Sequence, residues 1–182
     1  QSANQSGHDN TLVQMANGTV SFGHMTPAAD TRLLGRWGTQ FAQPFAKDDV
    51  HGSLQFTGIT EYFRNGGYNL IGTVRLVGTW PAQTLEAEYA IRAGGDWALA
   101  DNHLTFRQEE MKSQVQSIRL NGKPADLAFA QRIGQSPREF AEEFARGMSG
   151  EQRVVFNSAD QITLISTTSD GQPFETDLRR RL

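Results

Sequence analysis

The chain has 182 residues, of which 37% are hydrophobic and 20% charged, and its formal net charge is −3. This length favours a single domain, and the composition is ordinary for a soluble globular protein. The negative charge argues against a binding surface for nucleic acid or for an anionic membrane. Because the chain has no cysteine, disulfides, thiolate metal sites and cysteine nucleophiles are excluded.

The sequence says less about the cellular compartment. The lack of cysteine is compatible with a periplasmic protein, which then has no thiols to mispair. No apolar run approaches the roughly 20 residues that a membrane-spanning helix needs, and no signal-peptide pattern is present. A mature exported form, a trimmed domain and a cytosolic protein all remain open.

The first 30 residues are polar and rich in Gln, Asn, Ser and Gly. This composition predicts a polar N-terminal arm over residues 1–30, ahead of one domain over residues 31–182. Within the arm, Asn17-Gly18 indicates a small hairpin.

Two strands are expected where the domain begins, over residues 33–41 and 53–64. In the second strand the apolar positions change phase at Gly58. A phase change of one residue exchanges the two faces of a strand, so we predict a β-bulge at Gly58. Bulges and glycines of this kind bend strands and are typical of sheets that curl into barrels.

Residues 59–106 carry the clearest pattern, a series of antiparallel strands. Turns are expected at Asn65-Gly66-Gly67, Ala93-Gly94-Gly95 and Asp101-Asn102. Between the turns the apolar residues alternate with polar ones, which indicates a sheet with one buried face and one wet face. The buried face of the longest strand is expected to hold Tyr68, Leu70, Val74, Leu76 and Trp80. Ile71 and Val77 are exceptions on the polar face.

The C-terminal third contains a helix followed by three short strands. Ser136-Pro137-Arg138-Glu139 is a capping box with proline at the first helical position, which predicts a helix from about residue 136 to residue 148. Its apolar face holds Phe140, Phe144 and Met148, which either cover the sheet or bind a partner protein. Strands are expected over residues 153–156, 161–166 and 174–180.

About eight or nine short strands with one inserted helix predict a mostly β fold, an antiparallel barrel that is closed or nearly closed. The interior of such a small barrel is either filled or able to hold one ligand. If it holds a ligand, Phe63, Tyr68, Trp80 and Tyr89 are the candidate lining residues.

Catalytic chemistry is not indicated. The four histidines are far apart and lack the spacing of metal ligands, so we predict no metal site and no cofactor. Asp48-Asp49 and Glu109-Glu110 are neighbours that point apart in an extended chain, which favours solvated charge over an acid–base pair. No nucleophile elbow, phosphate loop or dinucleotide-binding motif occurs. We therefore expect a protein that is not an enzyme.

The first strand resembles that of lipocalins at Gly35-Arg36-Trp37, which implies an antiparallel lipocalin-like β-barrel. In lipocalins a Gly-x-Trp on the first strand packs against an arginine from the last strand, at the closed end of the barrel. The sequence offers three candidates for that arginine, Arg179, Arg180 and Arg181, and does not decide between them.

Two segments resemble ToxS, the family of periplasmic effectors that partner the membrane-spanning regulator ToxR in vibrios. The first is residues 60–68 (TEYFRNGGY) leading into residues 74–76 (VRL). The second is residues 89–91 (YAI) followed by residues 95–104 (GDWALADNHL). The likeness extends with gaps from about residue 59 to residue 170, while residues 1–50 match nothing in the family.

The resemblance implies a non-enzymatic accessory protein in the periplasm, anchored in the membrane if the precursor carries an anchor. Such a protein binds and stabilises the periplasmic domain of a membrane-bound transcription regulator, and the complex accepts an amphipathic ligand such as a bile salt. An alternative is a stand-alone lipocalin-like carrier of a small hydrophobic molecule. Neither reading involves nucleic acid or direct insertion of this chain into a membrane.

Overall fold

The computed structural model describes residues 30–47, 49–126, 128–129, 137–148, 150–167 and 173–181. The N-terminal arm up to residue 29, with the hairpin expected at Asn17-Gly18, lies outside these residues. The described elements are β1 (Gly35–Lys47), β2 (Val50–Tyr62), β3 (Gly67–Trp80), β4 (Gln83–Ala100), β5 (His103–Leu120), β6 (Lys123–Pro124), α2 (Pro137–Met148), β7 (Gly150–Phe156), β8 (Gln161–Thr167) and β9 (Pro173–Arg181).

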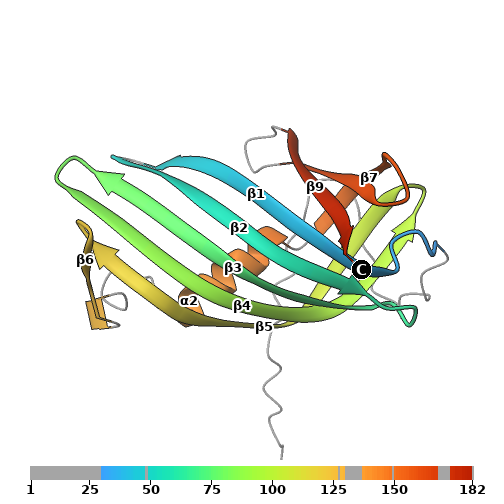
Figure 1. Cartoon of the computed structure of the whole chain (residues 1–182), viewed down its shortest axis with the longest axis horizontal. Coiled ribbons are helices and arrows are strands. Elements are labelled where there is room, and N and C mark those ends of the chain that lie inside the picture. The colour runs from blue at the N-terminus through green and yellow to red at the C-terminus, as the bar shows by residue number, and fades with distance from the viewer. Residues whose placement is uncertain are drawn as a thin grey trace, which may run out of the picture.

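The strands form one antiparallel sheet that closes into a ring (Figure 1). Its order is β4-β3-β2-β1-β9-β8-β7-β5, and a further pairing between β4 and β5 closes it. Among the described strands, the two-residue strand β6 pairs with β5 alone. The predicted mostly β, barrel-like architecture is confirmed, and α2 lies over the residues at which a helix was expected.

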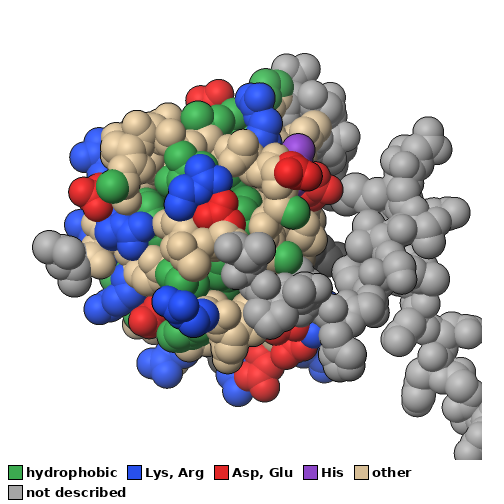
Figure 2. Space-filling view, turned by 90° about the vertical axis from the view of Figure 1, so that its right-hand side faces the viewer, with side chains coloured by type: hydrophobic (Ala, Val, Ile, Leu, Met, Phe, Trp, Pro, Cys, Tyr) green, Lys and Arg blue, Asp and Glu red, His purple; other side chains and the backbone are tan. Residues whose placement is uncertain are grey.

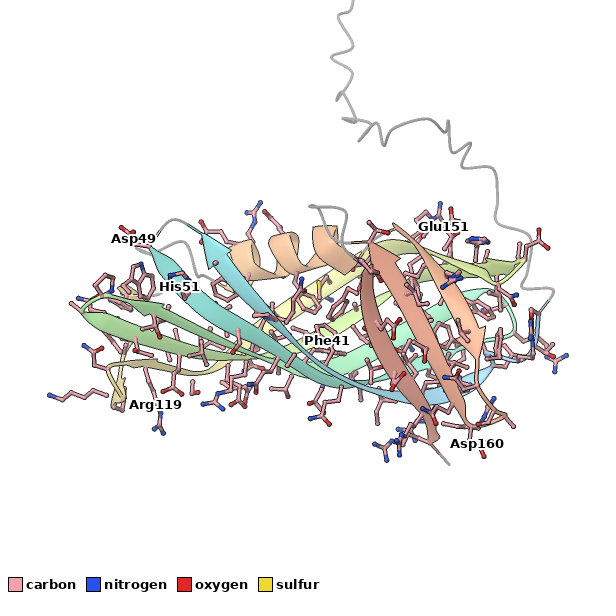
Figure 3. All side chains as sticks on the ribbon, turned by 90° about the horizontal axis from the view of Figure 1, so that it is seen from above. Phe41, Asp49, His51, Arg119, Glu151 and Asp160 are labelled. Carbon is pink, nitrogen blue, oxygen red and sulfur yellow. The ribbon has the colours of Figure 1, made fainter. Side chains whose placement is uncertain are left out.

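The ring is complete at one end only. Strand β9 pairs with β1 over residues 36–39, and β7 pairs with β5 over residues 103–106. Among the described residues, the remainder of β1 pairs with β2 alone, and residues 107–118 of β5 pair with β4 alone. Helix α2 lies across this open half of the sheet (Figures 1 and 3).

The predicted bulge at Gly58 is wrong. Gly58 keeps a continuous register, opposite Thr39 on β1 and Gly72 on β3. A Cβ atom at Gly58 would lie 2.4 Å from the ring of Phe56, and one at Gly72 would lie 2.5 Å from the same ring. The glycines therefore make room for a large side chain on the inner face, and the apparent phase change arises because the apolar Ile59 points outward.

The predicted turn at Ala93-Gly94-Gly95 is also wrong, because β4 runs through it without interruption. A Cβ atom at Gly95 would lie 2.1 Å from the carbonyl oxygen of Arg107 on β5, so the glycine allows the two strands to approach closely. The register of β4 against β5 shifts between Gly94 and Gly95, and again between Glu88 and Tyr89. These irregularities bend the sheet.

The other two predicted turns are confirmed by their backbone conformations. Gly66 has a φ of +86°, in the turn between β2 and β3. Asp101 and Asn102 have φ values of 49° and 62°, as a tight hairpin between β4 and β5 requires. After this hairpin the chain continues without interruption as one long strand, β5, to Leu120.

The inner face of the sheet carries the alternating apolar residues, as predicted, and they form one core. Tyr68, Leu70 and Val74 of β3 are buried, whereas Trp80 at the end of that strand is 36% exposed. Ile71 is 51% exposed on the outer face. Among the described residues, no helix is long and apolar enough to cross a bilayer.

Candidate ligand and partner site

The four predicted ligand-lining residues do not come together in one place. Tyr68 and Tyr89 face the interior and are buried, but they lie in opposite halves of the sheet. Phe63 follows the end of β2, where its carbonyl oxygen accepts a hydrogen bond from Nε1 of Trp97 (3.2 Å). Trp80 lies at the far end of β3. Whether any of them contacts a ligand stays a prediction.

The closed end is organised around Trp37 and Arg180. The guanidinium of Arg180 lies 4.4 Å from the centre of the Trp37 ring. It donates hydrogen bonds to the carbonyl oxygens of Leu34 (2.8 Å), Arg32 (3.0 Å) and Ala159 (3.0 Å). The structure thus identifies Arg180, among the three candidates, as the arginine that packs on Gly-x-Trp.

Aromatic side chains fill the interior next to the closed end. The ring of Tyr62 packs edge-on against Trp97 (5.3 Å between centroids), and Tyr68 packs edge-on against Phe106 (5.2 Å). Burial raises the pKa of Tyr68 to about 12, with a further contribution from the charge of Asp96, and burial raises the pKa of Tyr62 well above its usual value. This half of the interior is packed.

In the open half, helix α2 covers the inner face of the sheet. The ring of Phe140 stacks on Tyr89 with 4.0 Å between centroids and an interplanar angle of 4°. The centroid of the Phe144 ring lies 6.0 Å from that of the Phe56 ring. Both phenylalanines are buried, so they contact the protein's own sheet in this conformation, and a partner could reach them only if the helix moved away. The side chain of Met148 lies outside the described residues.

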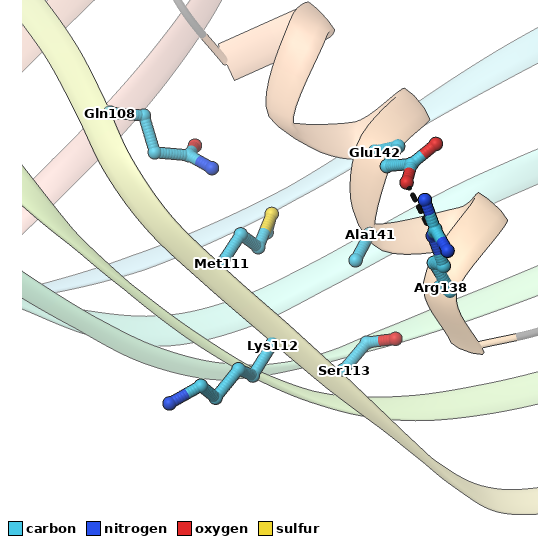
Figure 4. A pocket seen from close by; sticks show the side chains of 7 residues that line it. All are labelled: Gln108, Met111, Lys112, Ser113, Arg138, Ala141 and Glu142. Carbon is cyan, nitrogen blue, oxygen red and sulfur yellow. Dashed lines mark hydrogen bonds and ion pairs between the residues drawn. The ribbon is translucent and has the colours of Figure 1, made fainter.

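A depression of about 510 Å³ lies between α2 and the free edge of β5. It is lined by Gln108, Met111, Lys112, Ser113, Arg138, Ala141 and Glu142 (Figure 4). Nε of Arg138 donates to the Glu142 carboxylate at 2.8 Å, on the outer side of the helix. Nζ of Lys112 lies 3.7 Å from the Glu110 carboxylate, so both basic groups at the depression are paired with acidic ones.

A second, smaller depression of about 380 Å³ lies at the closed end, lined by Arg32, Phe156, Ser158, Ala159 and Arg180. Both arginines are already engaged, since Arg32 pairs with Asp30 and lies 3.7 Å from the centre of the Phe156 ring. Figure 2 shows basic, acidic and hydrophobic side chains interspersed over this end of the molecule. No single charge dominates here.

The histidines and the neighbouring carboxylates considered in the sequence do not come together in one place. His103 lies 3.8 Å from Glu151 on an exposed surface, and His51 is exposed on β2. Glu109 is left unpaired in the register between β4 and β5, and its carboxylate accepts a hydrogen bond from Arg107 (2.9 Å). Within the described ranges, no group of three or more His, Asp or Glu side chains could hold a metal ion.

One feature that sequence reasoning missed is the free edge of β1. Pro44 is the sequence signal that could have indicated it, because proline has no N–H and occurs in sheets mainly where that position faces an unpaired edge. In the structure Pro44 pairs with Ser53 of β2 and has no partner on its other side among the described strands.

In comparisons with known proteins, no family model matches this chain, and no curated protein has a significantly similar sequence.

Proposed function

We propose that this chain is a non-enzymatic periplasmic accessory protein that binds and stabilises the periplasmic domain of a membrane-bound transcription regulator. The observation that carries the proposal is the incomplete ring, in which β1 and β5 leave part of their edges without a neighbouring strand among the described residues. The resemblance of residues 59–170 to ToxS supplies the kind of partner.

An unpaired strand edge offers backbone N–H and C=O groups to an incoming strand. Residues 40–47 of β1 form such an edge beside β9, which pairs with β1 no further than Thr39. Because Pro44 lacks an N–H yet lies in a strand paired with β2, its position faces the free edge, and so does that of Ala42 two residues earlier. A partner strand along β1 would continue the ring.

An amphipathic molecule such as a bile salt would occupy the same open half in place of α2. Its apolar part would then meet the rings of Phe56 and Tyr89, which α2 covers in this conformation. Lys112 and Arg138, at the adjoining depression, are paired with Glu110 and Glu142 and would have to exchange these partners for the anionic group of the ligand. A ligand that binds only the folded complex stabilises it by mass action.

Co-expression with the regulator tests the proposal. A gene for a winged-helix regulator with one transmembrane span, adjacent to the gene for this chain, identifies the partner to use. We expect the two periplasmic domains to co-purify and to elute together in size-exclusion chromatography. Failure of the wild-type pair to form a complex would overturn the proposal.

The edge is tested by two substitutions that change one backbone N–H each. Ala42→Pro removes a donor from the free edge and is expected to weaken the complex while the isolated protein stays folded. Pro44→Ala restores a donor and is expected to preserve binding. Equal affinity of the Ala42→Pro variant and the wild type would show that the regulator uses another surface.

A second candidate function is that of a stand-alone carrier of a small hydrophobic molecule. It is favoured by the aromatic inner face beneath α2, where Tyr89 stacks on Phe140. It predicts saturable binding of a fluorescent fatty acid by the isolated protein, with displacement by a bile salt. Absence of binding at high micromolar concentrations of the fatty acid would count heavily against a carrier.

A further inference from the structure

We infer that helix α2 is a displaceable plug, which occupies the open half of the sheet until an amphipathic small molecule takes its place. The inference rests on the proposed function for the identity of the incoming occupant. The existence of the opening itself is a separate property of the fold and can be measured without any ligand.

The packing of α2 supports this role. Phe140 and Phe144 reach the interior and contact Tyr89 and Phe56, as an apolar ligand would. The backbone of the sheet beneath the helix is held by its own ladders, since β2, β3 and β4 pair continuously along their lengths. Removing α2 would therefore expose apolar rings without breaking a strand pairing, so the helix can open at a lower free energy than the whole domain.

The neighbours of α2 in space also lie mainly along one strand, β5. That strand has a free edge beside the helix, and its register against β4 is interrupted twice. A helix attached chiefly to one strand can move away from the other side of the ring without disturbing the closed end. The Trp37 and Arg180 contact lies at that closed end and would persist.

A glycine follows the helix where a hinge would have to be. Gly150, the first residue of β7, has a φ of +140°, a conformation that other residues rarely adopt. A Cβ atom at Gly150 would meet no atom of the described residues within 4 Å, so glycine is needed here for the backbone conformation and not for space. Gly122, with a φ of +75° and no described atom within 4 Å of its Cβ position, offers a matched position in the turn between β5 and β6.

Reactivity of single introduced thiols tests the opening, because the chain has no cysteine of its own. Ala141 on α2 is 7% exposed and Ala93 on β4 is 9% exposed, so Ala141→Cys and Ala93→Cys are matched in chemistry and burial. Under native conditions we expect a maleimide to label Ala141→Cys at least about tenfold faster than Ala93→Cys. Equal rates, limited by global unfolding, would overturn the inference.

A reversible tether tests whether the opening controls binding. Met111 on β5 and Ala141 line the same depression, so a disulfide between Met111→Cys and Ala141→Cys would hold the helix down (Figure 4). We expect the oxidised double variant to lose binding of dansylundecanoic acid and to regain it on reduction. The two single variants, which cannot form the disulfide, serve as controls.

The outcomes of these experiments distinguish failure of the plug from failure of the proposed function. If the fatty acid binds the oxidised and reduced forms equally, the interior binds ligand but α2 does not gate it, and the inference is overturned. If Ala141→Cys opens readily and the fatty acid binds but the regulator domain does not, the plug stands and the proposed function fails. The hinge is checked in the same assay, since Gly150→Ala should change the labelling rate of Ala141→Cys whereas Gly122→Ala should not.

Discussion

The guanidinium of Arg180, on the last strand, lies 4.4 Å from the centre of the Trp37 ring on the first strand. These two strands close the ring, and their pairing covers only residues 36–39 of β1. The same guanidinium reaches three backbone carbonyl groups, on both sides of the seam. One side chain thus joins the two ends of the domain where the backbone ladder is short.

Loss of this side chain is expected to destabilise the fold. Arg180→Met removes three hydrogen bonds and a cation–π contact, so the free energy of unfolding should fall by about 2–4 kcal/mol in urea denaturation. Arg179→Met is the control, because Arg179 is exposed and its side chain makes no hydrogen bond or ion pair with the described residues; it should change stability by about 0.5 kcal/mol or less. Similar effects of the two substitutions would contradict the assignment of Arg180.

Truncation of the helix face measures how much α2 contributes. Phe144 is 8% exposed and packs against Phe56, so Phe144→Ala should lower the free energy of unfolding by about 3–5 kcal/mol. Phe63→Ala, at a partly exposed position outside the core, should cost less. A negligible effect of Phe144→Ala in urea denaturation would show that the helix does not stabilise the isolated protein.

Crowding on the inner face makes Gly72 sensitive to substitution. The Cβ atom of Gly72→Ala would lie 2.5 Å from the Phe56 ring and 2.8 Å from the carbonyl oxygen of Thr57, so we expect a loss of about 1–3 kcal/mol in thermal or urea unfolding. At Gly94 the nearest atoms are 3.3 Å and 3.4 Å away, and Gly94→Ala should be tolerated better. Addition of Phe56→Leu to Gly72→Ala should recover part of the loss.

The buried tyrosines predict a loss of stability at alkaline pH. Burial raises the pKa of Tyr89 to about 12, while an exposed tyrosine in the unfolded chain titrates near pH 10. Between these values the unfolded state binds fewer protons than the folded state, so stability is complete below about pH 10 and falls towards pH 12. Urea denaturation at pH 9 and pH 11 should show this fall, and Tyr89→Phe should reduce its slope. A slope unchanged by Tyr89→Phe would contradict the burial of this hydroxyl.

Much of the fold was predictable because its signals are local. Alternation of apolar and polar residues assigns Tyr68, Leu70 and Val74 to one face wherever the strand lies. Asp101-Asn102 favours positive φ angles by its own chemistry, and Pro137 favours the start of a helix. These features depend on neighbours in the chain, so a single sequence carries them.

The candidate site was much less predictable, because it depends on residues far apart in the chain. Phe63, Tyr68, Trp80 and Tyr89 have the right character for a cavity, but strand register distributes them over different parts of the sheet. The stacking of Phe140 on Tyr89 depends on where α2 returns to the sheet, which its amphipathic pattern does not specify. The free edge of β1 becomes visible only once the pairing of β9 is known.

By itself, then, the sequence determined an antiparallel β domain, the residues on its inner face, two of its turns and the position of its helix. The tertiary structure decided that Gly58 relieves a close contact and marks no bulge, and that Gly95 lies within a strand and not in a turn, since what a Cβ atom would meet depends on other strands. It also selected Arg180 over Arg179 and Arg181. Alternate residues point to opposite faces of a strand, and Arg180 is the one on the face that meets Trp37.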